Sequence, residues 1–489
     1  MKQTGAEKKP TLKRPGRLLL FAVAGCALFY LLLAEPPDDL ELWHSERLEE
    51  EFSRRKLDEI RSFADYRLLE ERLLAEMAEK ITSKTAAGPG FELVRYSSGS
   101  VANPEQFSPN WNMSFELPVT QPVGGALLLH GMSDSPYSLR KLALSLHSRN
   151  FWVLGLRLPG HGTIPSALKY VSWEDMDAAV GLAASHLLEK TGQRPIHLVG
   201  YSTGAPLALN YALNTMQAKG TPLPASLILI SPAIGVHPAA RLAVVKNWLS
   251  HLPGLGQLAW LSIEPEFDPY KYNSFATSAG TQVYRLTSSV VQRISQLAHA
   301  GQTDRFPPVL VCKSAIDATV SNRAVVENLL RPLGDYGHEL LLFDINRLAA
   351  KSALISSAKA DSSAGLIKDE TLPAAVTLLT NRSPDTRAVQ LHRSPSLSST
   401  VSDTPIVDMR WPAGVFSLSH VALPFAPDDP LYGMSPPADE KHLFLGQMTV
   451  KGERGLLRIP ADYFIRLRHN PFYSLLEERA LDWVITHTN

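Results

Sequence analysis

Cysteine is almost missing from this chain of 489 residues, which contains only Cys26 and Cys312. Cys26 lies near the N-terminus, whereas Cys312 follows an apolar run in the body of the protein. No second cysteine is therefore available to pair within that body. This shortage excludes a disulfide framework and a metal site built on several thiolates.

Net charge is missing as well, because 48 Lys and Arg residues balance 48 Asp and Glu residues. Without an excess of positive charge, the protein has no overall field that attracts a phosphate backbone, and we expect no nucleic-acid partner. The hydrophobic content of 45% is ordinary for a globular protein. The length is sufficient for one large α/β domain with additions, or for two domains.

Charge is unevenly distributed at the N-terminus. A basic segment at residues 1–17 precedes an uncharged apolar run at residues 18–34. This pattern predicts a single-pass transmembrane anchor, with a cytoplasmic N-terminus and the body in the periplasm or outside the cell. Alternatively, Val23-Ala24-Gly25-Cys26 resembles a bacterial lipobox and would make the protein a lipoprotein acylated at Cys26. The apolar run continues past Cys26, which favours the uncleaved anchor.

Two regions follow the predicted anchor. Residues 35–87 are rich in charge with apolar residues at helical spacing, which predicts an amphipathic helical spacer. In residues 88–489, short apolar runs alternate with helical stretches, which predicts an α/β fold: a mostly parallel sheet with helices on both faces. We expect strands at residues 91–96, 125–129, 151–156, 195–199, 226–230, 308–313 and 339–343.

Two long segments interrupt this alternation. Residues 235–306 separate two predicted strands and contain several aromatic residues, so we expect a helical cap insertion over the mouth of the site. Residues 348–408 are rich in Ser, Ala, Thr and Arg and poor in aromatic residues, which predicts a flexible insertion.

A nucleophile is indicated by the pentapeptide Gly200-Tyr201-Ser202-Thr203-Gly204, which lies between an apolar run and a helix-compatible stretch. A G-x-S-x-G sequence in that context is typical of a strained strand-to-helix turn that exposes the serine hydroxyl. The glycines are needed because a side chain at either glycine position would clash in so tight a turn. We therefore interpret Ser202 as a candidate nucleophile.

An oxyanion hole is expected beside that serine. His130-Gly131-Met132 follows a predicted strand, where the backbone N–H of Met132 is one candidate donor. The N–H of Thr203, at the start of the helix, is the second. We interpret His130, and His161 within Pro159-Gly160-His161-Gly162, as structural histidines.

An acid and a base complete the candidate site. Asp317 follows a predicted strand, and His420 lies in an apolar stretch further along, so the chain order is Ser, Asp, His. Asp344 is the alternative acid; His338 and His442 are the alternative bases. Such a site requires no metal and no cofactor.

These motifs resemble the α/β-hydrolase superfamily and, within it, the monoacylglycerol lipase-like serine hydrolases. The resemblance runs from about residue 124 to residue 421. It implies a triad of Ser202, Asp317 and His420 and a carboxylic ester substrate. The chain departs from the family in the segment between Asp317 and His420, which is several times longer than usual. We assign no role to the tail after Pro424.

The expected function is that of a membrane-anchored serine hydrolase of the carboxylesterase or lipase type. It would cleave small acyl esters or lipid-like esters through an acyl-enzyme intermediate. An amidase, a peptidase or an acyltransferase could use the same triad, and these alternatives stay open. A non-catalytic interaction protein of the cell envelope is a further alternative, and the sequence identifies no protein partner.

Overall fold

The protein is described by a computed structural model that covers residues 40–218, 220–235, 256–317, 320–349, 365–366, 369–397, 406–438, 443–448 and 467–488. The predicted basic segment, the predicted anchor and Cys26 lie outside these residues. Across the described ranges, no helix is at once long enough and apolar enough to cross a bilayer.

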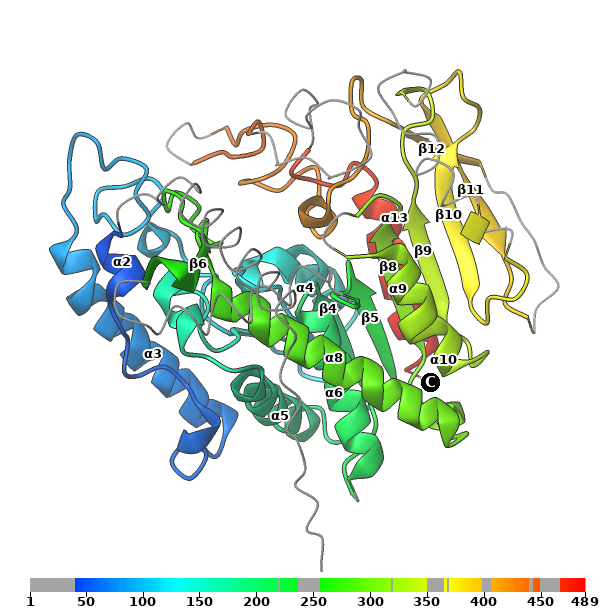
Figure 1. Cartoon of the computed structure of the whole chain (residues 1–489), viewed down its shortest axis with the longest axis horizontal. Coiled ribbons are helices and arrows are strands. Elements are labelled where there is room, and N and C mark those ends of the chain that lie inside the picture. Colours follow the sequence, from blue (N-terminus) through cyan, green and yellow to red (C-terminus); the bar gives the residue numbers. More distant parts are fainter. Residues whose placement is uncertain are drawn as a thin grey trace, which may run out of the picture. The chain divides into compact units, whose positions relative to one another are not determined.

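A ten-stranded sheet organises the body (Figure 1). Its strand order is β1-β3-β2-β4-β5-β8-β9-β10-β11-β12. Neighbours from β3 to β10 are parallel, whereas β1, β11 and β12 pair in antiparallel fashion. The strands are β1 Phe115–Leu117, β2 Gly124–Leu129, β3 Phe151–Leu156, β4 Ile196–Tyr201, β5 Ser226–Ile230, β8 Val309–Ser314, β9 Glu339–Phe343, β10 Ala375–Asn381, β11 Ala388–Ser394 and β12 Ile406–Arg410.

The central strands are apolar on both faces, because each face is covered by helices. In β2, Leu127 and Leu129 join one hydrophobic cluster, whereas Ala126 and Leu128 join the other. Continuous apolar runs of this kind are typical of parallel strands that are buried on both sides. The runs that predicted six of the strands therefore reflect two-sided burial.

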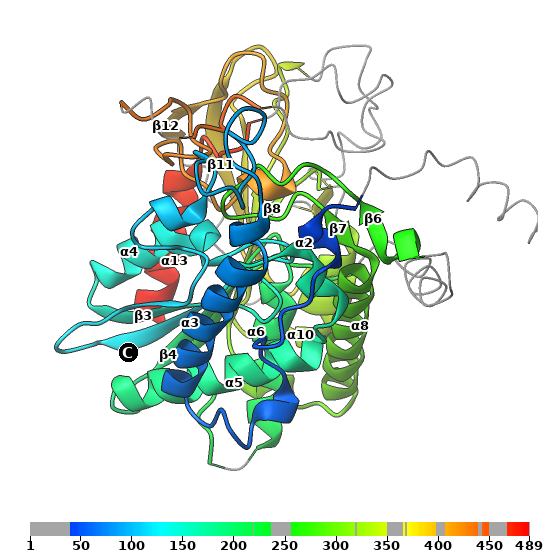
Figure 2. The same ribbon diagram turned by 90° about the vertical axis from the view of Figure 1, so that its left-hand side faces the viewer.

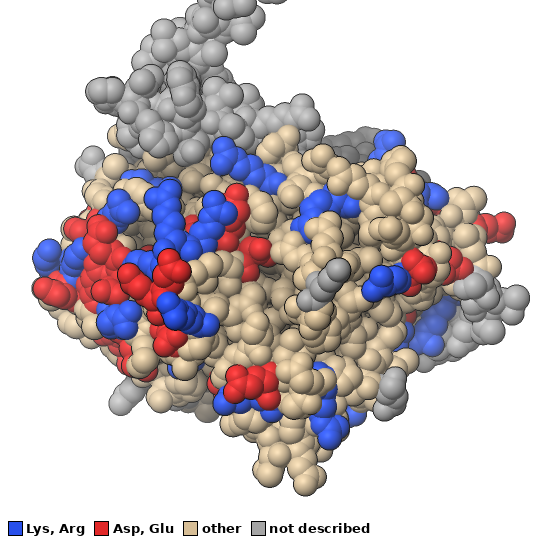
Figure 3. Space-filling view, turned by 90° about the horizontal axis from the view of Figure 1, so that it is seen from below, with Lys and Arg blue, Asp and Glu red and all other residues tan. Residues whose placement is uncertain are grey.

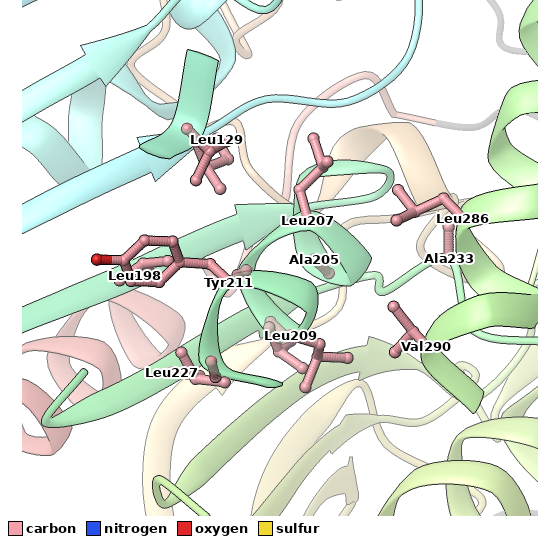
Figure 4. Packing of buried hydrophobic residues seen from close by; sticks show 14 of the residues in the cluster. Leu129, Leu198, Ala205, Leu207, Leu209, Tyr211, Leu227, Ala233, Leu286 and Val290 are labelled. Carbon is pink, nitrogen blue, oxygen red and sulfur yellow. The ribbon is translucent and has the colours of Figure 1, made fainter. Parts of the chain in front are cut away.

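Helices on the first face include α5 Trp173–Lys190, α6 Gly204–Gln217 and α8 Thr277–His299. Figure 4 shows Leu207 and Leu209 of α6 among side chains of the strands and of α8. The second face is covered by α4 Arg140–His147 and the C-terminal helix α13 Tyr473–Thr486. The prediction of a mostly parallel sheet with helices on both faces is confirmed.

The strand predicted at residues 91–96 is wrong. This segment forms turns, and the side chain of Arg95 is buried there. Its guanidinium donates to the carbonyl oxygens of Asp268, at 3.0 Å, and Lys271, at 3.3 Å. The segment is therefore held by partners far along the chain, which local alternation of apolar residues does not reveal.

Part of the predicted flexible insertion at residues 348–408 forms strands. Strand β10 pairs in parallel with β9, and β11 and β12 follow it in antiparallel order, so the insertion extends one edge of the sheet. Val376, Leu378 and Leu379 of β10 are buried against the body. Residues 350–364, 367–368 and 398–405 lie outside the described ranges.

The predicted cap at residues 235–306 divides into different parts. Helix α8 belongs to the layer that covers the sheet, since Leu286, Val290 and Ile294 are buried in the main cluster. Before it, β6 Trp260–Ser262 and β7 Phe275–Ala276 form a small hairpin. Residues 236–255, the other part of the predicted cap, lie outside the described ranges.

The predicted N-terminal spacer forms an integral layer of the body. Its main helix, α3 Phe63–Lys80, packs beside α5 (Figures 1 and 2). The hydroxyl of Tyr66 donates to the carbonyl oxygen of Arg157 at 2.8 Å, and Arg157 pairs with Glu70 at 3.0 Å and Glu51 at 3.1 Å. Basic and acidic side chains are interspersed on the face in Figure 3, in line with the balanced composition.

If this layer is integral, the substitution Tyr66→Ala destabilises the whole body. Tyr66 is fully buried, so we expect its loss to lower the free energy of unfolding by about 3 to 5 kcal/mol. Leu68→Ala is the matched control, because Leu68 lies on the same helix but is 55% exposed, and its change should stay within about 0.5 kcal/mol. Urea denaturation of the full chain measures both. Equal effects of the two substitutions would contradict the integral packing of α3.

Candidate active site

The turn at Ser202 joins strand β4 to helix α6. Ser202 has a φ of 52°, a left-handed conformation that is uncommon for a residue with a side chain. Its backbone is held on three sides: its N–H donates to Ile230 at 2.9 Å, and its carbonyl accepts from Ala205 at 3.2 Å and Ala233 at 3.1 Å. The surrounding backbone thus maintains the strained conformation.

Two glycines make the turn possible. A Cβ atom on Gly200 would lie 2.5 Å from backbone atoms of Ala205. A Cβ atom on Gly204 would lie 2.0 Å from the carbonyl oxygen of Leu129, at the end of β2. Neither position has room for a side chain, because the helix starts directly against the strands. The geometry is that of a strained strand-to-helix elbow with the serine at its tip.

The structure brings Ser202, Asp317 and His420 into one chain of contacts. The Nε2 atom of His420 lies 3.0 Å from Oγ of Ser202, and its Nδ1 atom lies 2.9 Å from Oδ2 of Asp317. Ser202 follows β4 and Asp317 follows β8, so both lie at the carboxyl ends of parallel strands. His420 starts the short turn His420–Ala422. With a proton on Nδ1, the imidazole is oriented to accept the serine proton at Nε2.

The long segment between Asp317 and His420 returns to the site along the ends of the strands. The hydroxyl of Ser314 donates to the carbonyl oxygen of Leu418 at 2.9 Å. Asn346 binds the same stretch through its backbone N–H, 2.8 Å from the Phe416 oxygen, and its side-chain amide, 2.9 Å from the Val415 oxygen. After strands β10 to β12, the chain therefore returns to the ends of the central strands and places His420 beside Ser202 and Asp317.

Both predicted oxyanion donors lie close to Ser202: Thr203 follows it in the sequence, and the loop with Met132 approaches it in space. Thr203 immediately precedes helix α6, where the first N–H groups have no partner within the helix. The loop with Met132 passes close to the serine, since a Cβ atom on Gly131 would lie 3.1 Å from Cβ of Ser202. Among the described residues, the N–H groups of Met132 and Thr203 donate to no carbonyl oxygen.

His130 and His161 are buried and held by the backbone. The Nε2 atom of His130 accepts from the N–H of Leu158 at 3.0 Å, and its Nδ1 lies 2.8 Å from the oxygen of Gly131. The two rings lie 4.9 Å apart. Burial lowers the pKa of His130 well below its usual value and the pKa of His161 to about 4. Both histidines are therefore neutral and fix the loops beside the serine.

The two described alternatives, Asp344 and His338, have partners other than Ser202. Asp344 pairs with Arg347 at 2.7 Å and accepts from the hydroxyl of Thr380 at 2.6 Å. His338 precedes β9, at the end of the strand away from the serine, and its Nδ1 accepts from the N–H of Val309 at 3.1 Å. His442 lies outside the described residues.

The acid is surrounded by donors. Oδ1 of Asp317 accepts from the N–H of Val320 at 3.0 Å, and Oδ2 accepts from Nζ of Lys313 at 2.6 Å as well as from His420. Burial by itself raises the pKa of Asp317, but His420 and Lys313 outweigh it and hold the pKa well below its usual range. Asp317 is therefore a carboxylate at neutral pH. Sequence reasoning missed Lys313, whose signal is a lysine in an apolar strand four residues before the acid.

The segment after His420 is fixed by a buried polar cluster that the sequence did not reveal. Asp429 accepts from the hydroxyl of Tyr137 at 3.0 Å and pairs with Arg140 at 2.9 Å. The hydroxyl of Tyr432 lies 2.7 Å from the carboxylate of Asp268. The first residues of the tail after Pro424 are therefore anchored to helix α4, to Tyr137 just before it, and to the segment before α8.

Within the described ranges, no three His, Cys, Asp or Glu side chains form a cluster suited to a metal ion.

The close contact at Gly204 generates a prediction about the elbow. The substitution Gly204→Ala places a methyl group against the Leu129 oxygen, so we expect a loss of more than about 2 kcal/mol in the free energy of unfolding. Gly181→Ala is the control, because Gly181 lies in helix α5 with no atom within 4 Å of the new Cβ, and it should be neutral or stabilising by up to about 1 kcal/mol. Thermal denaturation compares the two. A Gly204→Ala protein as stable as wild type would contradict this packing.

Comparisons with known proteins find a family model and several solved structures that are similar to part of this chain. Residues 126–350 match the model of a family described as the alpha/beta hydrolase family. A structure from work on two metagenome-derived lipolytic enzymes is 19% identical, covers 48% of this chain and 88% of its own, and has a TM-score of 0.40. The monoacylglycerol lipase of Paleococcus ferrophilus is 19% identical over 46% of this chain and 83% of its own, with a TM-score of 0.33.

A soluble variant of the monoglyceride lipase of Saccharomyces cerevisiae, in complex with a substrate analogue, is 16% identical. That match covers 47% of this chain and 81% of the yeast chain, with a TM-score of 0.36. Residues 126–350 are therefore similar to the alpha/beta hydrolase family, and the mostly parallel sheet and the elbow at Ser202 have the geometry of the α/β-hydrolase fold.

Proposed function

We propose that this protein is a serine hydrolase that cleaves carboxylic esters through an acyl-enzyme intermediate. The observation that carries the proposal is the continuous contact from Ser202 Oγ to His420 Nε2 and from His420 Nδ1 to Asp317 Oδ2. Esters are the substrates proposed because resonance stabilises an ester carbonyl less than an amide carbonyl, so a serine oxygen attacks an ester more readily. Attachment to a membrane through residues 18–34 is part of the proposal and is supported by the sequence alone.

In the proposed reaction, His420 takes the proton of Ser202 as its oxygen attacks the acyl carbonyl carbon. The negative charge that develops on the carbonyl oxygen is stabilised by the N–H groups of Met132 and Thr203. The imidazolium then gives its proton to the departing alcohol. A water molecule, deprotonated by the same histidine, attacks the acyl-enzyme and releases the acid. Asp317 stays ionised throughout and stabilises the imidazolium.

The first test is the substitution Ser202→Ala. Loss of the nucleophile should lower the turnover of p-nitrophenyl acetate and longer p-nitrophenyl esters by about 10⁴-fold or more, and it should abolish labelling by a fluorophosphonate probe. The control is Ser148→Ala, which removes an exposed hydroxyl and should change neither readout. Ester turnover that survives in Ser202→Ala would disprove the proposal.

The second test separates the candidate bases. The substitution His420→Ala removes the group that activates the serine, so turnover should fall by about 10⁴-fold or more while the fold is retained. The substitution His338→Ala removes a histidine that precedes β9, at the end of that strand away from Ser202. Its turnover per folded molecule should be unchanged. Circular dichroism determines the folded fraction of each variant. The assignment of the base fails if the two effects are reversed.

A further inference from the structure

Lys313 is a buried cation at the centre of the proposed site. It lies on strand β8, and its side chain and that of Asp317 are both 0% exposed. Its Nζ atom donates to Oδ2 of Asp317 at 2.6 Å and to the carbonyl oxygen of Val320 at 2.7 Å. Both partners are acceptors, and the adjacent carboxylate favours the charged ammonium form.

The carboxylate oxygen that binds Lys313 is also the one that binds the imidazole. Oδ2 of Asp317 lies 2.6 Å from Nζ of Lys313 and 2.9 Å from Nδ1 of His420. The acid therefore divides its charge between two donors, one of which is already positive. An imidazolium formed at His420 is stabilised by Asp317 but repelled by the ammonium at close range, in surroundings where little water screens the repulsion.

We propose that Lys313 is a positioning residue: it holds the Asp317 carboxylate in place, and its positive charge opposes the formation of an imidazolium at His420. The inference rests on the proposed serine hydrolase activity. Its consequence is that the acidic limb of the pH–rate profile depends on a residue that does not touch the substrate.

Two other ionisable groups, Tyr201 and Asp134, lie near His420 and are unchanged by substitutions at residue 313. The ring of Tyr201 lies 5.8 Å from the ring of His420, and burial raises the pKa of this phenol well above its usual value. Asp134 influences Tyr201, and burial raises the pKa of Asp134 to about 7, within the range of the assay. Because both stay in place, a difference between variants at residue 313 is not due to their titration.

The test is the pH dependence of kcat/KM for p-nitrophenyl acetate and of the rate of fluorophosphonate inactivation. Lys313→Met removes the charge, and Lys313→Gln removes the charge but keeps an N–H donor. In both variants the midpoint of the acidic limb should move to higher pH by about 1 unit or more. Lys313→Arg restores a cation and should return the limb towards that of wild type.

Arg479→Met is the matched control. It removes the cation that pairs with Glu339 at the start of strand β9, away from the serine. It should lower stability without moving the acidic limb. An unmoved limb in folded Lys313→Met and Lys313→Gln would overturn the inference while leaving the hydrolase proposal intact. So would failure of both neutral variants to fold, because the role of Lys313 would then lie in folding. A wild-type protein that neither turns over esters nor reacts with the probe would overturn both proposals.

Discussion

The site depends on how closely helix α6 approaches the end of strand β2. Gly204 lies directly against the carbonyl oxygen of Leu129, so the chain must turn within a few residues from strand to helix. This turn imposes the left-handed backbone at Ser202 and places the loop of Gly131 against the serine side chain. The backbone strain at Ser202 costs energy, and the burial of apolar side chains between helix α6 and the sheet offsets that cost.

The parallel sheet does the rest of the assembly. Strands β4, β5 and β8 are consecutive neighbours, so residues that follow β4 and β8 emerge at the same edge despite their separation in the chain. The six central strands were predictable because two-sided burial leaves uninterrupted apolar runs. Strands β10 to β12 were not, because they follow a polar segment and their stability comes from pairing with β9, which local composition does not show.

The candidate site was predictable to a similar degree. The elbow sequence and the strand ends pointed to Ser202, Asp317 and His420, and the structure brings these three side chains together. Lys313 was beyond sequence reasoning, since its role depends on which oxygen of Asp317 it shares with His420. The buried partners of Arg95 were equally inaccessible, because hydrogen bonds to distant carbonyl groups leave no periodic signal.

The buried pairing of Arg157 with Glu70 has a consequence for synthesis on the ribosome. Arg157 follows Glu70 by 87 residues, so the nascent chain carries the acid long before it carries the base. Burying a carboxylate without its partner costs several kcal/mol, which prevents helix α3 from docking early. The N-terminal layer is the first described part of the chain to be synthesised, yet it can dock only after Arg157 and helix α5, against which α3 packs, have been synthesised as well.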